Sequence, residues 1–97
     1  MGQSRRPQPV RLSSKLRQVR KLLGLSQEQM AERLKEVKSP PQPGHISEFE
    51  SGKREPSLLV LVRYARLSGL LVDVIVDDEL DLPNRLPSKS RHKQEQV

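Results

Sequence analysis

The 97-residue chain contains no cysteine and no tryptophan, and it has a single phenylalanine, Phe49, and a single tyrosine, Tyr64. The absence of cysteine excludes disulfides and thiolate metal sites. Because aromatic residues are so few, the core must be built from leucine, valine, isoleucine, methionine and alanine. The only two histidines, His45 and His92, lie far apart in the sequence. We therefore predict no metal and no cofactor.

Long apolar runs are also absent, and none approaches the roughly 20 residues of a membrane-spanning helix. The chain does not begin with the charged and then apolar order of a signal peptide. We predict a cytoplasmic protein with no membrane partner. An enzyme is disfavoured, because neither histidine accompanies a nucleophile and a carboxylate and a chain this short has little room for a substrate pocket. We predict no catalytic residue.

Basic residues exceed acidic ones, with 18 Lys and Arg against 12 Asp and Glu, which gives a net charge of +6. The acidic strip, as we call the carboxylates gathered near the C-terminal end, consists of Asp73, Asp77, Asp78, Glu79 and Asp81. A basic body with segregated acidic residues indicates a polyanion bound on one face. The alternative is a solvated surface whose charge is merely uneven.

Prolines divide the chain, since they gather near both ends and at Pro40, Pro41 and Pro43. The polar, proline-containing ends are typical of segments without a core. We predict a disordered basic arm over residues 1–10, one folded domain over residues 11–82 and a disordered basic tail over residues 83–97.

Apolar residues at helical spacing predict the first helix, and they are Leu12, Leu16, Val19 and Leu23. Ser13 or Ser14 is available near its start, Gly24 ends it, and Lys15 falls among the polar residues of its other side. Ser26 and Gln29 have the spacing of a capping box, which begins a second helix running to about Lys35 or Val37.

Pro43 suits the first position of a third helix, with Gln42 as its N-cap, an end near Ser51 and Gly52 in the turn that follows. Ser57 predicts the start of a fourth helix, which Gly69 ends. The apolar run at 70–76 is rich in β-branched residues and could form a strand. We favour a short fifth helix, because a lone strand would have no partner.

Several linked segments resemble the Xre/lambda-repressor-like helix-turn-helix domain found in phage repressors, bacterial regulators and antitoxins. They are Val19-Arg20, Gly24-Leu25-Ser26-Gln27, Met30-Ala31, Leu34, Ile46-Ser47, Phe49-Glu50, Gly52-Lys53-Arg54, Pro56-Ser57, Leu61, Tyr64-Ala65 and Gly69. The resemblance covers residues 12 to about 76. It implies an all-α fold, a compact five-helix domain whose third helix enters the major groove of DNA.

The resemblance implies a buried ion pair between Arg20 and Glu50 and a set of DNA contacts. Gln27, Lys53 and Arg54 match phosphate-contacting positions. Pro43 and Gly44 stand where the family often has base-reading side chains, and neither has a side-chain donor. The predicted DNA-binding residues are Gln27, Lys38, Gln42, Gly44, His45, Ser47, Glu48, Lys53 and Arg54. Lys38 lies in a proline-rich insertion of the turn.

Family members commonly dimerise near the fifth helix, so we predict a homodimer with candidate contacts at Leu71, Val72, Val74 and Ile75. The leading hypothesis is a sequence-specific regulator of transcription that binds double-stranded DNA. The alternative is an antitoxin or adaptor that binds a partner protein through the acidic strip or the tails and regulates its own gene through the same DNA-binding domain.

Overall fold

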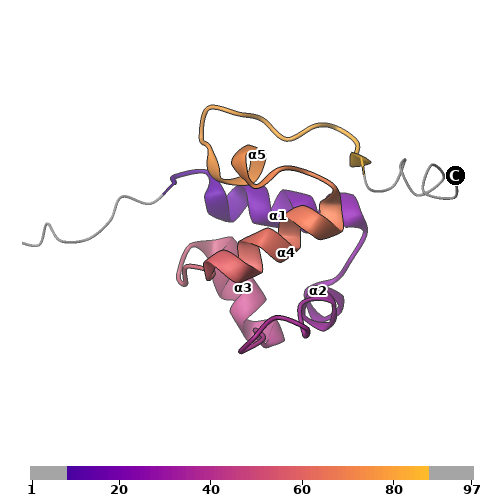
Figure 1. Cartoon of the computed structure of the whole chain (residues 1–97). Helices are drawn as coiled ribbons and strands as arrows, with labels where there is room; N and C mark the ends of the chain where they lie inside the picture. Colours follow the sequence, from indigo (N-terminus) through magenta and orange to yellow (C-terminus); the bar gives the residue numbers. More distant parts are fainter. Residues whose placement is uncertain (1–8, 88–97) are drawn as a thin grey trace, which may run out of the picture.

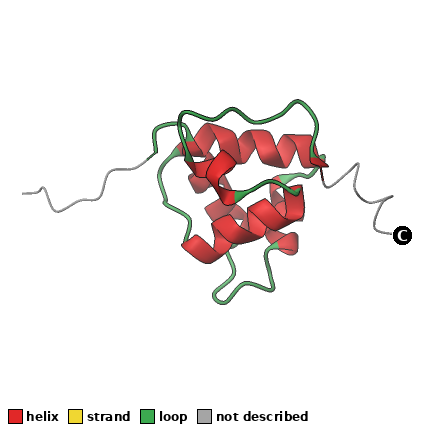
Figure 2. Cartoon of the chain, turned by 45° about the horizontal axis from the view of Figure 1, so that its top comes forward, coloured by secondary structure: helices red, strands yellow, loops and turns green. Residues whose placement is uncertain are grey.

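Five α-helices make up the fold in the computed structural model, which describes residues 9–87 (Figures 1 and 2). The helices are α1 (Leu12–Leu23), α2 (Gln27–Arg33), α3 (Pro43–Ser51), α4 (Leu58–Ser68) and α5 (Val72–Val76). The described part of the chain contains no strand. The all-α prediction is therefore confirmed, and the run at 70–76 contains a helix. None of the described helices has the length and apolar character needed to cross a membrane.

Local capping chemistry fixes most of the helix ends. The Ser26 hydroxyl accepts from the backbone N–H of Gln29 at 3.0 Å, and the Gln29 amide oxygen accepts from the Ser26 N–H at 2.8 Å, so the capping box is present. Gly52 ends α3 with a φ of 84°, a left-handed conformation that other residues adopt only with strain.

Two predicted helix ends were wrong. Arg11 is the N-cap of α1 and makes no side-chain cap, while Ser13 and Ser14 lie inside the helix. The Ser14 hydroxyl instead donates to the Arg11 carbonyl at 3.1 Å. Helix α2 ends at Arg33, earlier than expected, because the backbone N–H of Lys35 bonds to the carbonyl of Glu32 in a tighter turn.

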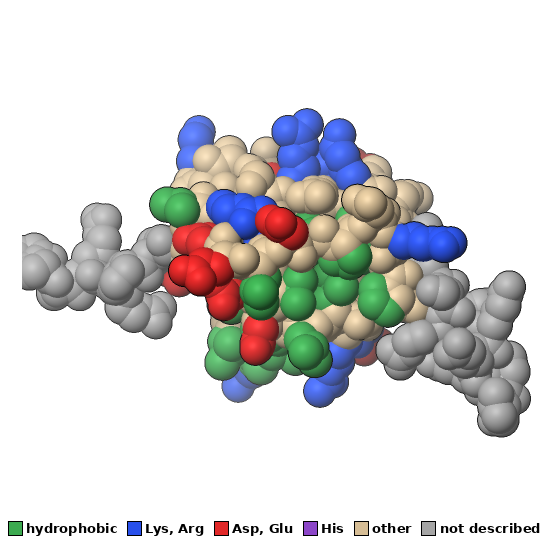
Figure 3. Space-filling model, turned by 90° about the horizontal axis from the view of Figure 1, so that it is seen from above, with side chains coloured by type: hydrophobic (Ala, Val, Ile, Leu, Met, Phe, Trp, Pro, Cys, Tyr) green, Lys and Arg blue, Asp and Glu red, His purple; other side chains and the backbone are tan. Residues whose placement is uncertain are grey.

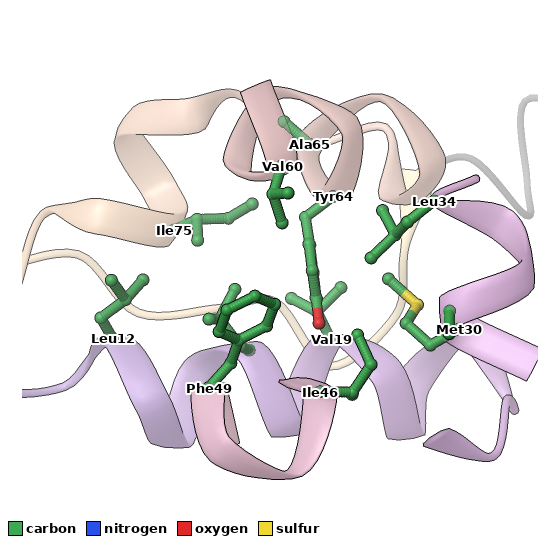
Figure 4. Packing of buried hydrophobic residues seen from close by; sticks show 12 residues of the cluster. Leu12, Val19, Met30, Leu34, Ile46, Phe49, Val60, Tyr64, Ala65 and Ile75 are labelled. Carbon is green, nitrogen blue, oxygen red and sulfur yellow. The ribbon is translucent and has the colours of Figure 1, made fainter. Parts of the chain in front are cut away.

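Helix α1 lies at the centre of the fold and packs against α3, α4 and α5, while α2 packs on α3. The buried side chains meet between these helices (Figure 4), and they are Leu12, Leu16, Val19, Met30, Ala31, Leu34, Ile46, Phe49, Val60, Tyr64, Ala65 and Ile75. Tyr64 extends from α4 toward Val19 and Ile46 (Figure 4). Burial raises the pKa of its phenol. This aliphatic core sets the position of α3 relative to α1 and α2.

Ile75 is wrong as a dimer candidate, because its side chain is fully buried in the core of the monomer. In α5, the other side chains of the predicted seam remain accessible: Val72 and Val74 are half-buried. Leu71, the N-cap of α5, is 72% exposed. A five-residue helix buries only one side chain deeply, and Ile75 takes that position.

The C-terminal boundary at residue 82 was also too early, because Leu86 is 2% exposed. The packed part of the chain therefore includes residues of the predicted tail. The rest of that tail and residues 1–8 of the predicted arm, with Arg5, Arg6 and His92, lie outside the described residues.

Lys15 is buried, not solvated as predicted, with 1% of its surface exposed. Its Nζ donates to the carbonyl of Val74 at 2.8 Å and to the carbonyl of Asp77 at 2.7 Å. Burial lowers the pKa of this ammonium, with the positive charge of Arg11 acting in the same direction. Lys15 thus caps the carbonyl end of α5, where a positive charge is favoured, and joins α5 to α1.

The acidic strip is partly occupied by the start of α1. The Asp78 carboxylate accepts from the backbone N–H groups of Val10, at 3.0 Å, and Arg11, at 2.9 Å. The Arg11 guanidinium donates to the Asp78 carbonyl at 2.6 Å and to Asp81 at 2.8 Å. Two of the five carboxylates, Asp78 and Asp81, therefore bind the start of α1 within the same chain. This weakens the case for the acidic strip as a site for a partner protein.

Asp78→Asn should make the domain less stable at neutral pH and make its stability less sensitive to acid. The backbone N–H groups of Arg11 and Val10 lower the pKa of the Asp78 carboxyl below its ordinary value. A carboxylate whose pKa is lower in the folded state than in the unfolded state stabilises the fold at any pH above its unfolded-state pKa. This contribution is lost as the pH falls through the folded-state pKa. Urea unfolding at pH 7 and at pH 3 should therefore show the gap between wild type and Asp78→Asn narrowing in acid.

Glu79→Gln is the control for this experiment, because it removes the same charge from the strip without touching the hydrogen bonds to Val10 and Arg11. It should unfold close to wild type at pH 7. A gap between wild type and Asp78→Asn that stayed constant from pH 7 to pH 3 would contradict the assignment.

Candidate nucleic-acid interface

Arg20 and Glu50 anchor α3 to α1. The Arg20 guanidinium donates to the two Glu50 carboxylate oxygens, at 2.7 Å from Nε and 3.0 Å from Nη2, and to the Leu25 carbonyl at 2.9 Å from Nη1. The side chains are 12% and 5% exposed. Hydrogen bonding by Glu50 raises the pKa of Arg20. The pair therefore fixes the turn before α2, and it determines which side of α3 faces the rest of the domain.

Gln27 joins the same network, since its Nε2 donates to Glu50 at 3.2 Å. Its side chain is half-buried at the start of α2 and directed at α3. The structure therefore gives the Gln27 amide a protein partner, and its contact with a phosphate stays a prediction.

A shallow hollow of about 220 Å³ opens beside this network, lined by Arg17, Arg20, Gln27, Ser47, Glu50 and Ser51. Arg17 is exposed and makes no hydrogen bond or salt bridge with any of residues 9–87. Arg17 was not among the predicted DNA-binding residues. It could have been recognised from its spacing, because Arg17 and Lys21 are four residues apart and therefore form a basic pair on the exposed side of α1.

The start of α3 is built by Gln42, Pro43 and His45. The backbone N–H of Gln42 donates to His45 Nδ1 at 3.1 Å, so the imidazole caps the helix from its third position. Pro43 occupies the first position, where its missing N–H leaves nothing unsatisfied. The cap accounts for one ring nitrogen of His45, and Nε2 is left for a partner.

Gly44 and Ser47 are exposed on α3, and a Cβ placed on Gly44 would meet no atom within 4 Å. This part of the helix therefore has no side chain covering it. A DNA backbone or base edge could approach it closely.

Glu48 and Arg54, both predicted to contact DNA, contact each other. The Arg54 Nε donates to the Glu48 carboxylate at 2.6 Å, and the two side chains are 49% and 41% exposed. This hydrogen bond lowers the pKa of Glu48. The two residues therefore form one polar unit, which spacing alone did not predict.

Lys38 and Lys53 lie on either side of α3 in the sequence, and both are exposed. Neither ammonium group makes a hydrogen bond or salt bridge within residues 9–87. Lys38 belongs to the insertion, which Pro41 ties down by being buried. Ser39 in the same loop has a φ of 56°, a left-handed conformation uncommon for serine.

Two helices joined by a turn, with the second held by its inner side and open along its outer side, define a helix-turn-helix domain. A helix-turn-helix family model matches residues 16–70, more than half of the chain. The protein belongs to this family, and the predicted Xre/lambda-repressor-like resemblance is confirmed. Neither the curated proteins nor the solved structures compared with the chain give a match. The family is one of DNA-binding regulatory domains.

Proposed function

We propose that the protein is a sequence-specific regulator of transcription that binds double-stranded DNA with α3 in the major groove. The observation that carries the proposal is the orientation of α3. The Arg20–Glu50 pair holds its inner side, and its outer side offers Ser47 and the unit of Glu48 and Arg54.

Cations that make no hydrogen bond or salt bridge within residues 9–87 lie next to α3, in the sequence or in space, and supply the attraction for phosphates. Lys53 follows α3, Lys38 precedes it, and Arg17 borders the hollow beside it. Phosphate contacts give affinity without sequence information, whereas groups in the groove discriminate between bases. Residues on α3 and next to it include both kinds of group.

Lys53→Ala should weaken binding to all duplexes by a similar factor. Loss of one phosphate contact lowers the slope of log K against log salt by about 1. The measurement is fluorescence anisotropy with a labelled duplex selected from a random pool, titrated at several salt concentrations. Arg17→Ala should behave in the same way if the hollow receives a phosphate.

Arg85→Ala is the matched control, because Arg85 is also exposed and its segment lies away from α3 (Figure 1). It should leave the salt slope unchanged. Equal binding by wild type and Lys53→Ala at every salt concentration would count against the proposed face. Failure of the wild type to bind any duplex would overturn the function itself.

We also propose that the protein binds DNA as a homodimer through an apolar surface on α4 and α5. Two adjoining hollows there share Val62 and Arg66, one extending to Leu59 and the other to Leu71. Leu59 is 56% exposed and Leu71 is 72% exposed. Figure 3 shows hydrophobic side chains gathered on the face that carries α5. Apolar surface of this kind is typical of an interaction site.

Leu71→Ser should shift the protein toward the monomer and weaken its binding to a two-fold symmetric site by more than tenfold, because two half-sites must then be bound separately. Sedimentation velocity measures the association state. Val10→Ser is the control, since Val10 is 82% exposed but lies at the start of α1. A Leu71→Ser protein as dimeric as wild type would exclude this seam.

A further inference from the structure

The chain after α3 folds back on Glu48. The Glu48 carbonyl accepts from the backbone N–H groups of Lys53, at 2.9 Å, and Arg54, at 3.2 Å. The Glu48 carboxylate accepts from Arg54 Nε at 2.6 Å. These three hydrogen bonds from Lys53 and Arg54 converge on one residue of α3. They hold the Arg54 guanidinium beside the helix, where it would otherwise extend from the loop.

The guanidinium keeps an unused edge in this position. Nε is engaged by Glu48, whereas Nη1 and Nη2 have no hydrogen-bond partner among the described residues. Two parallel N–H donors on a planar group match the O6 and N7 acceptors of guanine in the major groove. A carboxylate that fixes the other side of the guanidinium reduces the freedom lost on binding.

The start of α3 offers few competing donors. Pro43 and Gly44 have no polar side chain, and the Nδ1 of His45 caps the helix. A base-reading group must therefore come from further along the helix. Of the two exposed guanidinium groups near α3, Arg17 lies on α1 and has no residue within 9–87 fixing its position, whereas Arg54 is fixed by Glu48 and keeps its Nη1 and Nη2 donors in one plane.

We propose that Arg54 is the principal base-reading residue of this protein, specific for guanine, and that Glu48 is the positioning residue that aims it. This inference rests on the proposed function. It replaces two earlier expectations, in which Arg54 contacts a phosphate and Glu48 contacts DNA directly. In this proposal Glu48 acts through Arg54, whose Nε donates to one of its two carboxylate oxygens.

The test is selection of bound duplexes from a random pool, followed by affinity measurement on the selected site and on the same site with each base substituted. The wild type should prefer guanine at one position of each half-site by about tenfold to a hundredfold, as a bidentate pair does. Arg54→Lys keeps the charge but has no fork of donors. It should lose that preference while its affinity for unrelated duplex stays within about threefold, because a lysine still attracts phosphates.

Variants of Glu48 separate positioning from direct contact. Glu48→Gln should keep the guanine preference, because the glutamine oxygen can still accept from Arg54 Nε. Glu48→Ala should relax the preference by about tenfold and raise the affinity for unrelated duplex, since a negative charge leaves the interface. Because the pair is about half exposed, both variants should melt within a few degrees of wild type, which circular dichroism checks.

The outcomes separate this inference from the proposed function. Retention of the base preference by Arg54→Lys would overturn it and make Arg54 a phosphate contact. Loss of the preference in Glu48→Gln would also overturn it, because Glu48 would then contact the base directly. A wild-type protein that selects a symmetric site without a guanine at this position contradicts the inference alone. A protein that binds no duplex contradicts the proposed function.

Discussion

Arg20→Ala should destabilise the domain by about 3–5 kcal/mol, the range for removing one partner of a buried ion pair. The variant leaves the Glu50 carboxylate, 5% exposed, with only the Gln27 amide at 3.2 Å as a side-chain donor. It also leaves the Leu25 carbonyl without its guanidinium donor. A chain of this size has a free energy of unfolding of about 5–15 kcal/mol. The variant should therefore lose about a fifth or more of this free energy of unfolding.

Urea unfolding followed by circular dichroism measures this loss. Arg17→Ala is the matched control, because it removes an arginine one turn earlier from the same helix, where the side chain is exposed and has no partner among residues 9–87. It should change the free energy of unfolding by less than about 0.5 kcal/mol. If Arg20→Ala costs no more than Arg17→Ala, the pair contributes like a surface salt bridge and does not anchor α3.

A double variant separates the cost of leaving the Glu50 carboxylate unpaired from the loss of the ion pair itself. Arg20→Met combined with Glu50→Leu removes both charges and keeps similar volumes. It should be more stable than Arg20→Ala alone, since replacing a buried pair by apolar groups is often close to neutral. Its DNA affinity shows whether orienting α3 requires the ion pair or only packing.

Helix positions and most of the core were predictable from the sequence, because both depend on local chemistry. Gly24, Gly52 and Gly69 each end a helix, and Ser26 and Ser57 each cap one. These signals act within a few residues of themselves, so no knowledge of the tertiary fold is needed. Of the ends that were predicted wrongly, the start of α1 has serines that lie inside the helix and do not cap it, and the end of α2 has no glycine to mark it.

Pairings between distant residues were not predictable in the same way. The side chain of Asp78 bonds to the backbone of Val10 and Arg11 across 67 or 68 residues of sequence. The unit of Glu48 and Arg54 depends on the loop turning back after Gly52. The first pairing follows from the tertiary fold, and the second from the exact path of the loop, which the pattern of residue types did not give. Leu86 is buried for the same reason, because the chain returns to the body after α5.

The wrong prediction for Lys15 has a different cause. The spacing of Lys15 indicated a buried position, but its charge led us to place it on the polar side of α1. It lies three residues after Leu12 and four before Val19, which places it on the apolar side of α1. Counting lysine as polar moved it to the other side. The aliphatic part of a lysine can lie in a core while its ammonium group reaches a polar partner. The carbonyl end of α5 provides that partner.

Lys15→Met should destabilise the domain by about 1–3 kcal/mol, because it removes the two part-buried hydrogen bonds to the carbonyls of Val74 and Asp77, at about 0.5–1.5 kcal/mol each. Methionine fills a similar volume, so the loss reports the hydrogen bonds more than the packing. Hydrogen exchange should show the amides of α5 losing protection before those of α1 and α3. Lys15→Ala should cost more, because it also removes the buried part of the side chain.

Lys21→Met is the control for Lys15→Met, since Lys21 lies on the exposed side of the same helix and makes no hydrogen bond or salt bridge within residues 9–87. It should shift the free energy of unfolding by less than about 0.5 kcal/mol. The opposite result for Lys15→Met is also informative. If that variant is more stable than wild type, burying the ammonium costs more than its two hydrogen bonds return. The burial of Lys15 would then serve the placement of α5, and with it Leu71 and the proposed dimer seam, at the expense of stability.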